Sequence, residues 1–186
     1  MGDTRHPGAV PVSDHDAPLE TMWQGKFMTA VRRGRWEFVT RPRGVRAAVL
    51  LATIDGDILL VEQYRVPLGR SCVELPAGLI GDEVEGEDPL DAAGRELEEE
   101  TGYRAATLED CGEFFSSPGL LGESFTLIRA TGLTQVGPGG GVEGENITVH
   151  RVPLSEVQGF LAAKRAEGCG VDVRVLMLLA SEILGG

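Results

Sequence analysis

The feature that most constrains this chain is a predicted helix that ends the stretch ELPAGLIGDEVEGEDPLDAAGRELEEETGY, residues 74–103. Asp88 followed by Pro89 is typical of a helix start, because an aspartate side chain accepts from free N–H groups and proline fits the first helical position. Gly102 suits a left-handed helix end. One stripe of the helix is apolar and should face a core. Its members, at i, i+3 and i+7, are Leu90, Ala93 and Leu97.

A second face of the same helix is acidic. Residues three and four apart are neighbours on a helix, so Glu96, Glu99 and Glu100 lie together, whereas Glu98 points away from them. The helix alone leaves two interpretations open. The face is either a solvated surface, at a cost of about a few tenths of a kcal/mol for each like-charge pair, or a site for a divalent cation such as Mg²⁺, which prefers carboxylate oxygens.

The residues around the acidic face resemble the Nudix box, the loop–helix–loop motif of the Nudix hydrolases. From Glu87 the chain runs through seven residues to REL-x-EE-x-GY at residues 95–103, which matches the motif throughout. Gly81 has the spacing of the motif's glycine, but Gly78 is the better structural equivalent. The acidic turn then carries an insertion of about three residues, which a surface loop accepts at little cost. The match favours the cation site over the solvated face.

Composition and charge limit the class of protein further. The 186 residues suffice for one domain with a substantial core. No apolar run approaches the length of a membrane span, and residues 1–20 lack the pattern of a signal peptide. The three scattered cysteines are interpreted as reduced thiols of a cytoplasmic protein. A net charge of −12 disfavours nucleic acid and anionic membranes as partners.

The order of predicted elements indicates three regions. Residues 1–18 are predicted to be a flexible tail, residues 19–43 a β-hairpin, and residues 44–186 the Nudix domain. The expected class is α+β, an α/β/α sandwich with a mixed sheet. Within the domain we expect a flexible glycine-rich loop at 134–144. We also expect strands at 45–53, 58–63, 72–75, 106–115, 124–130 and 147–152, and helices at 154–166 and 171–184.

Four further segments resemble the ADP-ribose pyrophosphatase branch of the Nudix family: VEQYR at 61–65, ELPAG at 74–78, SPG at 117–119 and EGENI at 143–147. The resemblance implies hydrolysis of ADP-ribose to AMP and ribose 5-phosphate, with Mg²⁺ or Mn²⁺ as cofactor. Three alternatives stay open. The substrate could be another nucleoside diphosphate sugar, such as ADP-glucose or GDP-mannose, or the chain could be a non-catalytic module that binds ADP-ribose. The third alternative, hydrolysis of oxidised nucleoside triphosphates such as 8-oxo-dGTP, is disfavoured by Pro118 and Glu143.

The same resemblance implies roles for individual residues of the box. Glu96 and Glu100 would be the principal metal ligands, with Glu99 nearby and the carbonyl of Ala77 adding one bond. Arg95 would hold the carboxylates through charge-assisted pairs.

A general base is also needed to deprotonate water, and in this branch it lies on a mobile loop after the box. Glu143 matches the base and Glu145 an additional metal ligand, and the sequence leaves open which residue has which role. The glycines before them suit a loop that closes over substrate.

Substrate contacts are predicted outside the box. Arg65 is the candidate for a phosphate or terminal-ribose contact, because a guanidinium matches phosphate bidentately. Trp36 either packs in the core or in the hairpin, or stacks on a nucleobase. The resemblance to the branch also implies that Pro118 and Glu123 belong to the substrate-binding residues. In related enzymes the N-terminal hairpin crosses to a second subunit, so the resemblance implies a homodimer in which Trp36 contributes to the partner's site.

Overall fold

The computed structural model describes residues 12–41, 46–80, 88–142 and 144–184. It separates into two compact units. The smaller comprises Met1–Gly44 and Ser117–Glu123, and the larger comprises Val45–Ser116 and Ser124–Gly186. Within the described ranges, no helix combines the length and the apolar character needed to cross a membrane.

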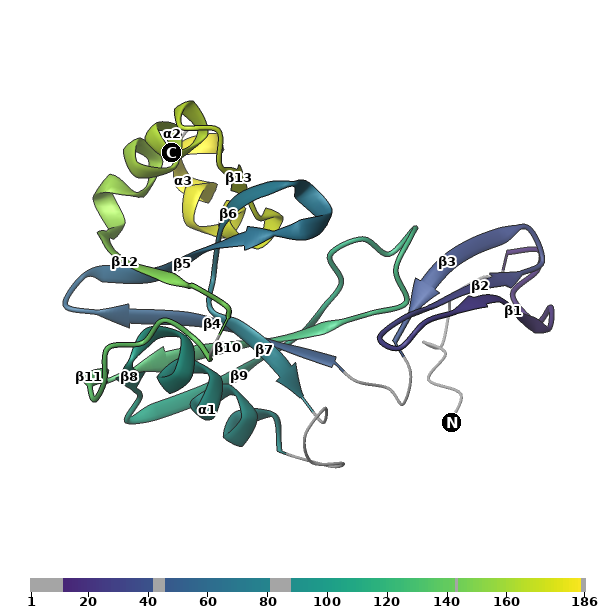
Figure 1. Ribbon diagram of the computed structural model, residues 1–186, viewed down its shortest axis with the longest axis horizontal. Coiled ribbons are helices and arrows are strands. Elements are labelled where there is room, and N and C mark those ends of the chain that lie inside the picture. The colour runs from purple at the N-terminus through teal and green to yellow at the C-terminus, as the bar shows by residue number, and fades with distance from the viewer. Residues whose placement is uncertain (1–11, 42–45, 81–87, 143, 185–186) are drawn as a thin grey trace. The chain divides into compact units, whose positions relative to one another are not determined.

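The larger unit is a mixed β-sheet with helices on both faces (Figure 1). Its strands are β4 (Arg46–Ile54), β5 (Asp57–Arg65), β6 (Arg70–Glu74), β7 (Ala77–Ile80), β8 (Tyr103–Arg104), β9 (Thr107–Phe114), β10 (Phe125–Thr131), β11 (Thr134–Gln135), β12 (Thr148–Pro153) and β13 (Gly170–Val171). Its helices are α1 (Pro89–Thr101), α2 (Val157–Ala166) and α3 (Ala180–Ile183), with 3₁₀ segments η2 (Val66–Leu68), η3 (Leu154–Glu156) and η4 (Val173–Leu179).

The sheet is organised around β4 and β5, which the predicted turn at Asp55 and Gly56 joins. β4 pairs in parallel with β10 and antiparallel with β7, and β10 pairs with the edge strand β9. β5 pairs antiparallel with both β12 and β6, and β6 pairs in parallel with β13. β6 thus pairs with β5 and β7 pairs with β4. Between these two strands, the carbonyl of Pro76 accepts from the N–H of Leu50 at 2.8 Å.

Alternation along β4 supplies two hydrophobic cores, one on each face of the sheet. Ala48 and Leu50 belong to the core that α1 covers, together with Ala93 and Leu97. Val49, between them, belongs to the core that contains side chains of α2 and η4. Successive residues of a strand point to opposite faces, so one strand serves both layers. The architecture is an α/β/α sandwich, which confirms the predicted fold class.

The C-terminal segment differs from the single helix predicted at 171–184. Gly170 and Val171 pair in parallel with β6 instead, so the chain stays extended up to Asp172. The Asp172 side chain then accepts from the N–H of Arg174 at 2.8 Å and begins η4. α3 follows as a short helix. Pairing with β6 thus delays the helical segment and brings Arg174 to the end of that strand.

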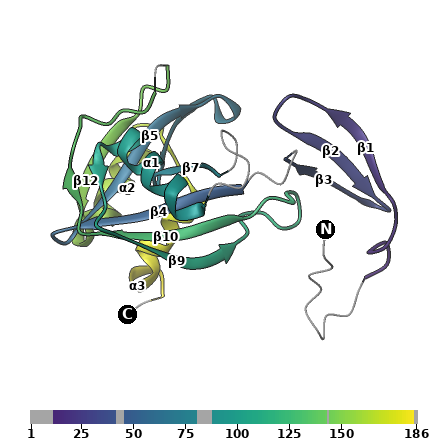
Figure 2. The same cartoon turned by 90° about the horizontal axis from the view of Figure 1, so that it is seen from below.

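The smaller unit is an antiparallel sheet of β1 (Leu19–Gln24), β2 (Thr29–Arg33) and β3 (Trp36–Thr40), side by side in Figure 2. The hairpin predicted for this region is therefore part of a three-stranded sheet. Residues 12–17, predicted as tail, form turns, and Asp14 is ion-paired with Arg35 at 2.8 Å. The described end of the tail is thus bonded to the turn between β2 and β3.

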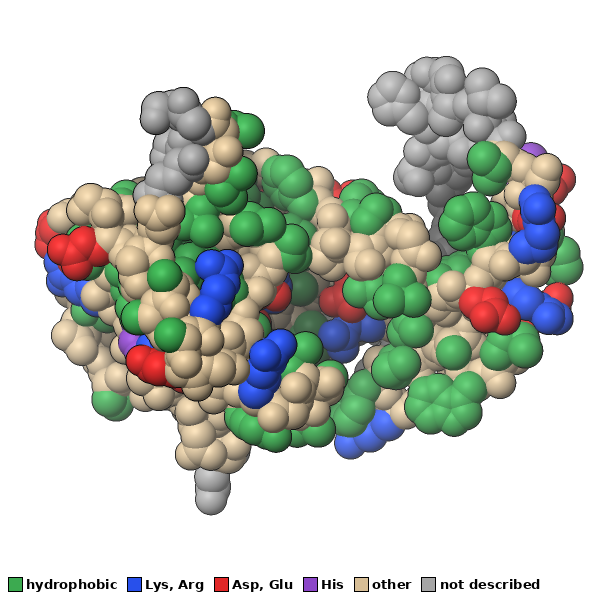
Figure 3. Space-filling view, turned by 90° about the horizontal axis from the view of Figure 1, so that it is seen from above, with side chains coloured by type: hydrophobic (Ala, Val, Ile, Leu, Met, Phe, Trp, Pro, Cys, Tyr) green, Lys and Arg blue, Asp and Glu red, His purple; other side chains and the backbone are tan. Residues whose placement is uncertain are grey.

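The segment Ser117–Glu123 joins the smaller unit through β3. The N–H of Val39 donates to the carbonyl of Leu120 at 2.9 Å, and the N–H of Gly122 donates to the carbonyl of Val39 at 2.8 Å. Hydrophobic side chains remain at the surface of this unit, among lysines and arginines (Figure 3). The large ones are Val12, Leu19, Met22, Trp23, Phe27, Met28, Trp36 and Leu120.

Candidate active site

Helix α1 begins and ends where the sequence predicts. The Asp88 side chain caps the first turn, and Gly102 takes a left-handed conformation with φ of 75°. Leu97 is fully buried, which fixes the rotation of the helix about its axis. With that rotation Glu100 lies inward, only 6% exposed, while Glu98 lies outward and pairs with Arg104. One face of the acidic helix is therefore buried in the molecule.

Gly78 in β7 leaves room for the side chain of Glu96. A Cβ atom at Gly78 would lie 1.9 Å from Cδ and 2.4 Å from Oε1 of Glu96, closer than atoms can approach. The Glu96 carboxylate thus rests directly on the β7 backbone. This contact agrees with the choice of Gly78 as the equivalent of the motif's glycine. The other candidate, Gly81, lies outside the described residues.

Glu100 is a carboxyl with a single backbone donor and acidic neighbours. Its Oε2 accepts from the N–H of Ala77 at 3.0 Å. Burial, above all, raises the pKa of the Glu100 carboxyl to about 8; the charges of Glu96 and Glu145 add to the rise, while the Ala77 N–H and Arg65 oppose it. Burial disfavours the charged form, so a proton or a cation must accompany this group at neutral pH.

Arg95 pairs with the acidic face from its own helix. Its Nη1 lies 3.0 Å from Oε1 of Glu96 and 3.5 Å from Oε2 of Glu99. Both distances are those of ion pairs. Glu99 is the more exposed of the two partners: 39% of its side chain is exposed, against 16% of the Glu96 side chain. The positioning role predicted for Arg95 is compatible with these contacts.

The glycine-rich segment predicted to be flexible is hydrogen-bonded to the C-terminal end of α1. The N–H groups of Gly140 and Gly141 donate to the carbonyls of Glu100 and Glu99 at 2.8 and 3.0 Å, and Gly137 donates to Gly102 at 3.1 Å. The last carbonyls of a helix lack partners within it, and here the loop supplies them. A Cβ at Gly102 would lie 2.4 Å from the carbonyl oxygen of Gly137, so glycine permits this close approach.

Glu145 lies just beyond that segment. Its Oε2 accepts from the N–H of Val142 at 2.9 Å, and its charge contributes to the raised pKa of Glu100. Gly141, with φ of 77°, has no room for a Cβ, which would lie 2.2 Å from Oε2 of Glu145. The structure therefore places Glu145 on the side of Glu100. Glu143, predicted as the general base, lies outside the described residues.

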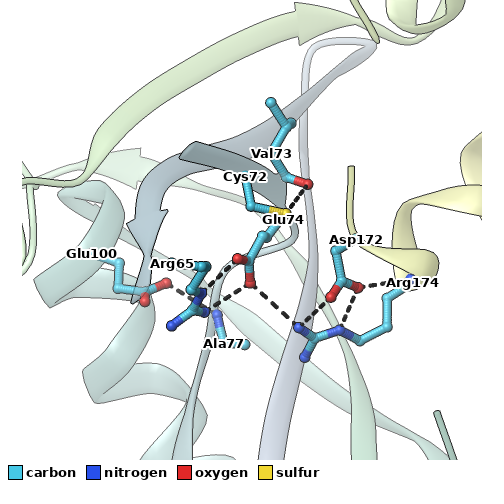
Figure 4. A network of polar contacts seen from close by, with 8 residues as sticks. All are labelled: Arg65, Cys72, Val73, Glu74, Ala77, Glu100, Asp172 and Arg174. Atoms are coloured by element: carbon cyan, nitrogen blue, oxygen red, sulfur yellow. Dashed lines mark hydrogen bonds and ion pairs between the residues drawn. The ribbon is translucent and has the colours of Figure 1, made fainter. Parts of the chain in front are cut away.

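Arg65 is held by a buried carboxylate (Figure 4). Its Nε and Nη2 donate to Oε1 and Oε2 of Glu74 at 2.6 and 2.8 Å, and Glu74 also accepts from Nη2 of Arg174 at 3.4 Å. The Glu74 side chain is 3% exposed. Sequence reasoning missed both Glu74 and Arg174 as site residues. The available signal for Glu74 was an acidic residue in the otherwise apolar sequence VELPAG. A charge buried in such a strand requires a partner.

The other predicted substrate residues lie in the smaller unit. Trp36 and Pro118 line one cavity of about 340 Å³, together with His15, Arg33 and Phe38. The Trp36 side chain is not core packing, since the residue is 51% exposed.

Glu123 also belongs to the smaller unit, where Arg41 Nε donates to its Oε2 at 2.9 Å. The sequence-predicted residues therefore form two groups, one in each unit.

The acidic group fits a hard divalent cation. Glu96, Glu100 and Glu145 offer carboxylate oxygens, and Gly78 leaves the room that the Glu96 carboxylate occupies. Among the described residues no three acidic, histidine or cysteine side chains already converge on one point. Mg²⁺ keeps several of its waters and takes few protein ligands, so it does not require such a closed cage.

Comparison with known proteins identifies the family. The model of the NUDIX domain matches residues 42–167. A methanol dehydrogenase activator of Bacillus methanolicus is 38% identical over 149 residues, which cover 80% of this chain and 78% of the relative. An ADP-ribose pyrophosphatase of Bacillus subtilis is 47% identical over 98 residues, 53% of this chain and 50% of the relative. A GDP-mannose pyrophosphatase of Cronobacter sakazakii is 34% identical over 147 residues, covering 74% and 72%.

The solved structures agree on the fold. A crystal structure of an ADP compounds hydrolase superposes with a TM-score of 0.66 at 22% identity, covering 90% of this chain and 92% of that one. The chain therefore belongs to the Nudix family. The relatives confirm the predicted resemblance to its ADP-ribose pyrophosphatase branch, and they support a pyrophosphohydrolase.

Proposed function

We propose that this protein hydrolyses the pyrophosphate bond of ADP-ribose, giving AMP and ribose 5-phosphate, with a divalent cation as cofactor. The observation that carries the proposal is Glu100, a buried carboxyl grouped with Glu96 and Glu145 and in need of a positive partner. The likeness to an ADP-ribose pyrophosphatase supports the substrate.

The cation, Mg²⁺ or Mn²⁺, would be held by Glu96 and Glu100, with Glu99, Glu145 and the carbonyl of Ala77 as further ligands. When bound, it neutralises the negative charge that gathers on the phosphate oxygens during hydrolysis. Arg95 orients the carboxylates through its pairs with Glu96 and Glu99. The residues of this group come from α1, from β7 and from the segment after Gly141, so the fold, and not one motif alone, assembles them.

Proton transfer from water is assigned to Glu143, with Glu145 as the second ligand of that segment. The hydrogen bond from the N–H of Val142 holds the Glu145 carboxylate against Gly141. Gly141 is itself bonded to the end of α1, so this position supports a ligand role for Glu145. Arg65 would receive a phosphate or the terminal ribose. Its bonds to Glu74 engage Nε and Nη2 and leave the Nη1 edge for a ligand.

Recognition of the nucleoside is assigned to the smaller unit. Trp36 and Pro118 line the same cavity, which supports a stacking role for the exposed indole ring. Glu123 is paired with Arg41 and is proposed to hold this segment in place.

We also propose a homodimer. A three-stranded sheet that exposes Trp23, Phe27 and Trp36 presents more apolar surface than a free sheet of this size usually does. A second copy of the chain is the proposed occupant. Multi-angle light scattering of the purified protein tests this, and a monomeric mass at micromolar concentration would contradict it.

The cytoplasm is the proposed location. Cys72, Cys111 and Cys169 are all free thiols in the structure, which supports a reducing compartment.

The second candidate function is hydrolysis of another nucleoside diphosphate sugar, favoured by the likeness to a GDP-mannose pyrophosphatase. A panel of ADP-ribose, ADP-glucose, GDP-mannose and 8-oxo-dGTP, assayed with Mg²⁺ and with EDTA, separates the candidates. ADP-ribose should have the highest kcat/KM, and EDTA should abolish turnover. Absence of ADP-ribose turnover overturns the first proposal, and absence of any turnover favours a non-catalytic binding module.

A further inference from the structure

Arg174 contacts the same carboxylate as Arg65, although it lies in the C-terminal segment η4. We propose that Arg174 is a positioning residue of the active site: it holds Glu74 so that Arg65 presents its remaining edge to the anionic substrate. This inference rests on the proposed function.

The first support is the position of Glu74. Its side chain is 3% exposed, so its charge must be balanced inside the protein. Arg65 supplies two hydrogen bonds and Arg174 a third, longer contact of 3.4 Å. Figure 4 shows the two guanidinium groups on either side of the carboxylate. Glu74 is therefore fixed from two directions, and Arg65 is fixed through it.

The second support is that Arg174 is itself immobilised. Its Nε and Nη2 donate to the two oxygens of Asp172 at 2.6 and 2.9 Å, and its guanidinium carbon lies 5.9 Å from the centre of the Phe125 ring. Its side chain is 17% exposed. A planar guanidinium held by a carboxylate and an aromatic ring has one fixed orientation. The flexible side chain of a lysine would not be fixed in this way.

The third support is the balance of charge. Asp172, Arg174, Glu74 and Arg65 alternate in sign and cancel as a group. Loss of Arg174 would leave this group with one net negative charge next to Arg65, the proposed substrate contact. A diphosphate would then meet added repulsion, and Glu74, held from one side only, would fix Arg65 less firmly. Both effects weaken substrate binding before they affect the bond that breaks.

The test compares Arg174→Gln with Arg104→Gln. Arg104 forms a pair of the same two-bond geometry with Glu98, away from the candidate site. Arg174→Gln should raise the KM for ADP-ribose by about tenfold or more with kcat changed by less than about threefold, the pattern of lost substrate binding. Arg104→Gln should leave both constants unchanged. A KM for Arg174→Gln equal to that of the wild type overturns the inference.

A second measurement does not depend on turnover. It follows the NMR signal of the Arg65 Nε–H proton, which is assigned by its loss in Arg65→Lys. This proton should exchange slowly with water in the wild-type protein and quickly in Arg174→Gln. An Arg65 signal that is unchanged in Arg174→Gln overturns the inference even when the wild type hydrolyses nothing. A wild type that hydrolyses nothing but shows the predicted signals overturns only the proposed function.

Arg174→Lys is the second variant, needed in case Arg174→Gln does not fold. It retains the positive charge but lacks the planar, forked guanidinium group. It should unfold near the wild-type temperature and give a KM between those of the wild type and Arg174→Gln. A wild-type KM for Arg174→Lys would show that charge alone suffices, which contradicts the positioning role.

Discussion

Two arginine–glutamate pairs of the larger unit have the same geometry and opposite surroundings. Arg65 with Glu74 and Arg104 with Glu98 are each joined by bonds of 2.6 and 2.8 Å. The Glu74 side chain is 3% exposed and that of Glu98 33%. An exposed pair contributes about 0–1 kcal/mol, because water competes for both ions. The distances of an ion pair therefore do not reveal its role, whereas its burial and its neighbours do.

The largest predicted contrast lies between the two faces of α1. Glu100→Gln should lower kcat roughly 10³-fold, because several kcal/mol of transition-state stabilisation depend on the bound cation and about 1.4 kcal/mol is tenfold. Glu98→Gln should stay within about twofold of the wild type, since only an exposed pair is lost. Initial rates with ADP-ribose measure both. Similar losses in the two variants would show that the buried face has no special role.

The next contrast concerns stability and the two pairs directly. Glu74→Ala should lower the free energy of unfolding by about 3–5 kcal/mol, because it leaves Arg174, whose side chain is 17% exposed, and the half-exposed Arg65 without their shared partner. Glu98→Ala should lower it far less, because water competes for both ions of that pair. Urea unfolding followed by circular dichroism gives both values. If Glu98→Ala were as harmful as Glu74→Ala, burial would not be the deciding factor.

A smaller effect is expected from the backbone beneath the acidic face. Gly78→Ala pushes the Glu96 carboxylate away from β7, and a misplacement of about 1 Å can lower activity by about 10²-fold. The unfolding temperature should change little, because the displaced atoms end a flexible side chain. Gly159→Ala is the matched control, since a Cβ there meets nothing within 4 Å. Unaltered activity in Gly78→Ala would argue against Glu96 as a ligand.

The smallest expected effect is the dependence of cation binding on pH. Burial raises the pKa of Glu100 from 4.5 to about 8, so folding favours its protonated form. Without a cation, the stability contributed by that group is full below pH 4.5 and is lost as pH rises through 8. Mg²⁺ replaces the proton and should raise the unfolding temperature more at pH 8 than at pH 6. Scanning calorimetry with Mg²⁺ and with EDTA measures this, and Glu100→Gln should abolish the difference between the two pH values.

Sequence could predict what local rules decide. The aspartate cap, the αL glycine and the apolar stripe specify α1 within a few neighbouring residues, and alternation along β4 specifies its two faces. The acidic face of α1 followed from helical spacing, and the fold class followed from the order of the predicted helices and strands.

Contacts between residues that are far apart in the chain could not be predicted from local sequence patterns. Arg174 is 100 residues from Glu74, and no local pattern records their contact. The contacts of the glycine-rich segment were out of reach for the same reason. A run of glycines indicates conformational freedom, but at Gly139 the missing side chain also permits close approach to the end of α1, which only the folded chain reveals.

The bonds from Gly140 and Gly141 to α1 end on the peptide units of Glu100 and Glu99. Displacing that loop therefore strains the backbone that carries the proposed ligands, so loop and helix end move mechanically as one part. Glu145 sits between the anchors at Gly141 and Ile147, the second of which bonds back to Gly140 at 3.1 Å. The reach of Glu145 is therefore limited by the short length of chain between two bonded residues.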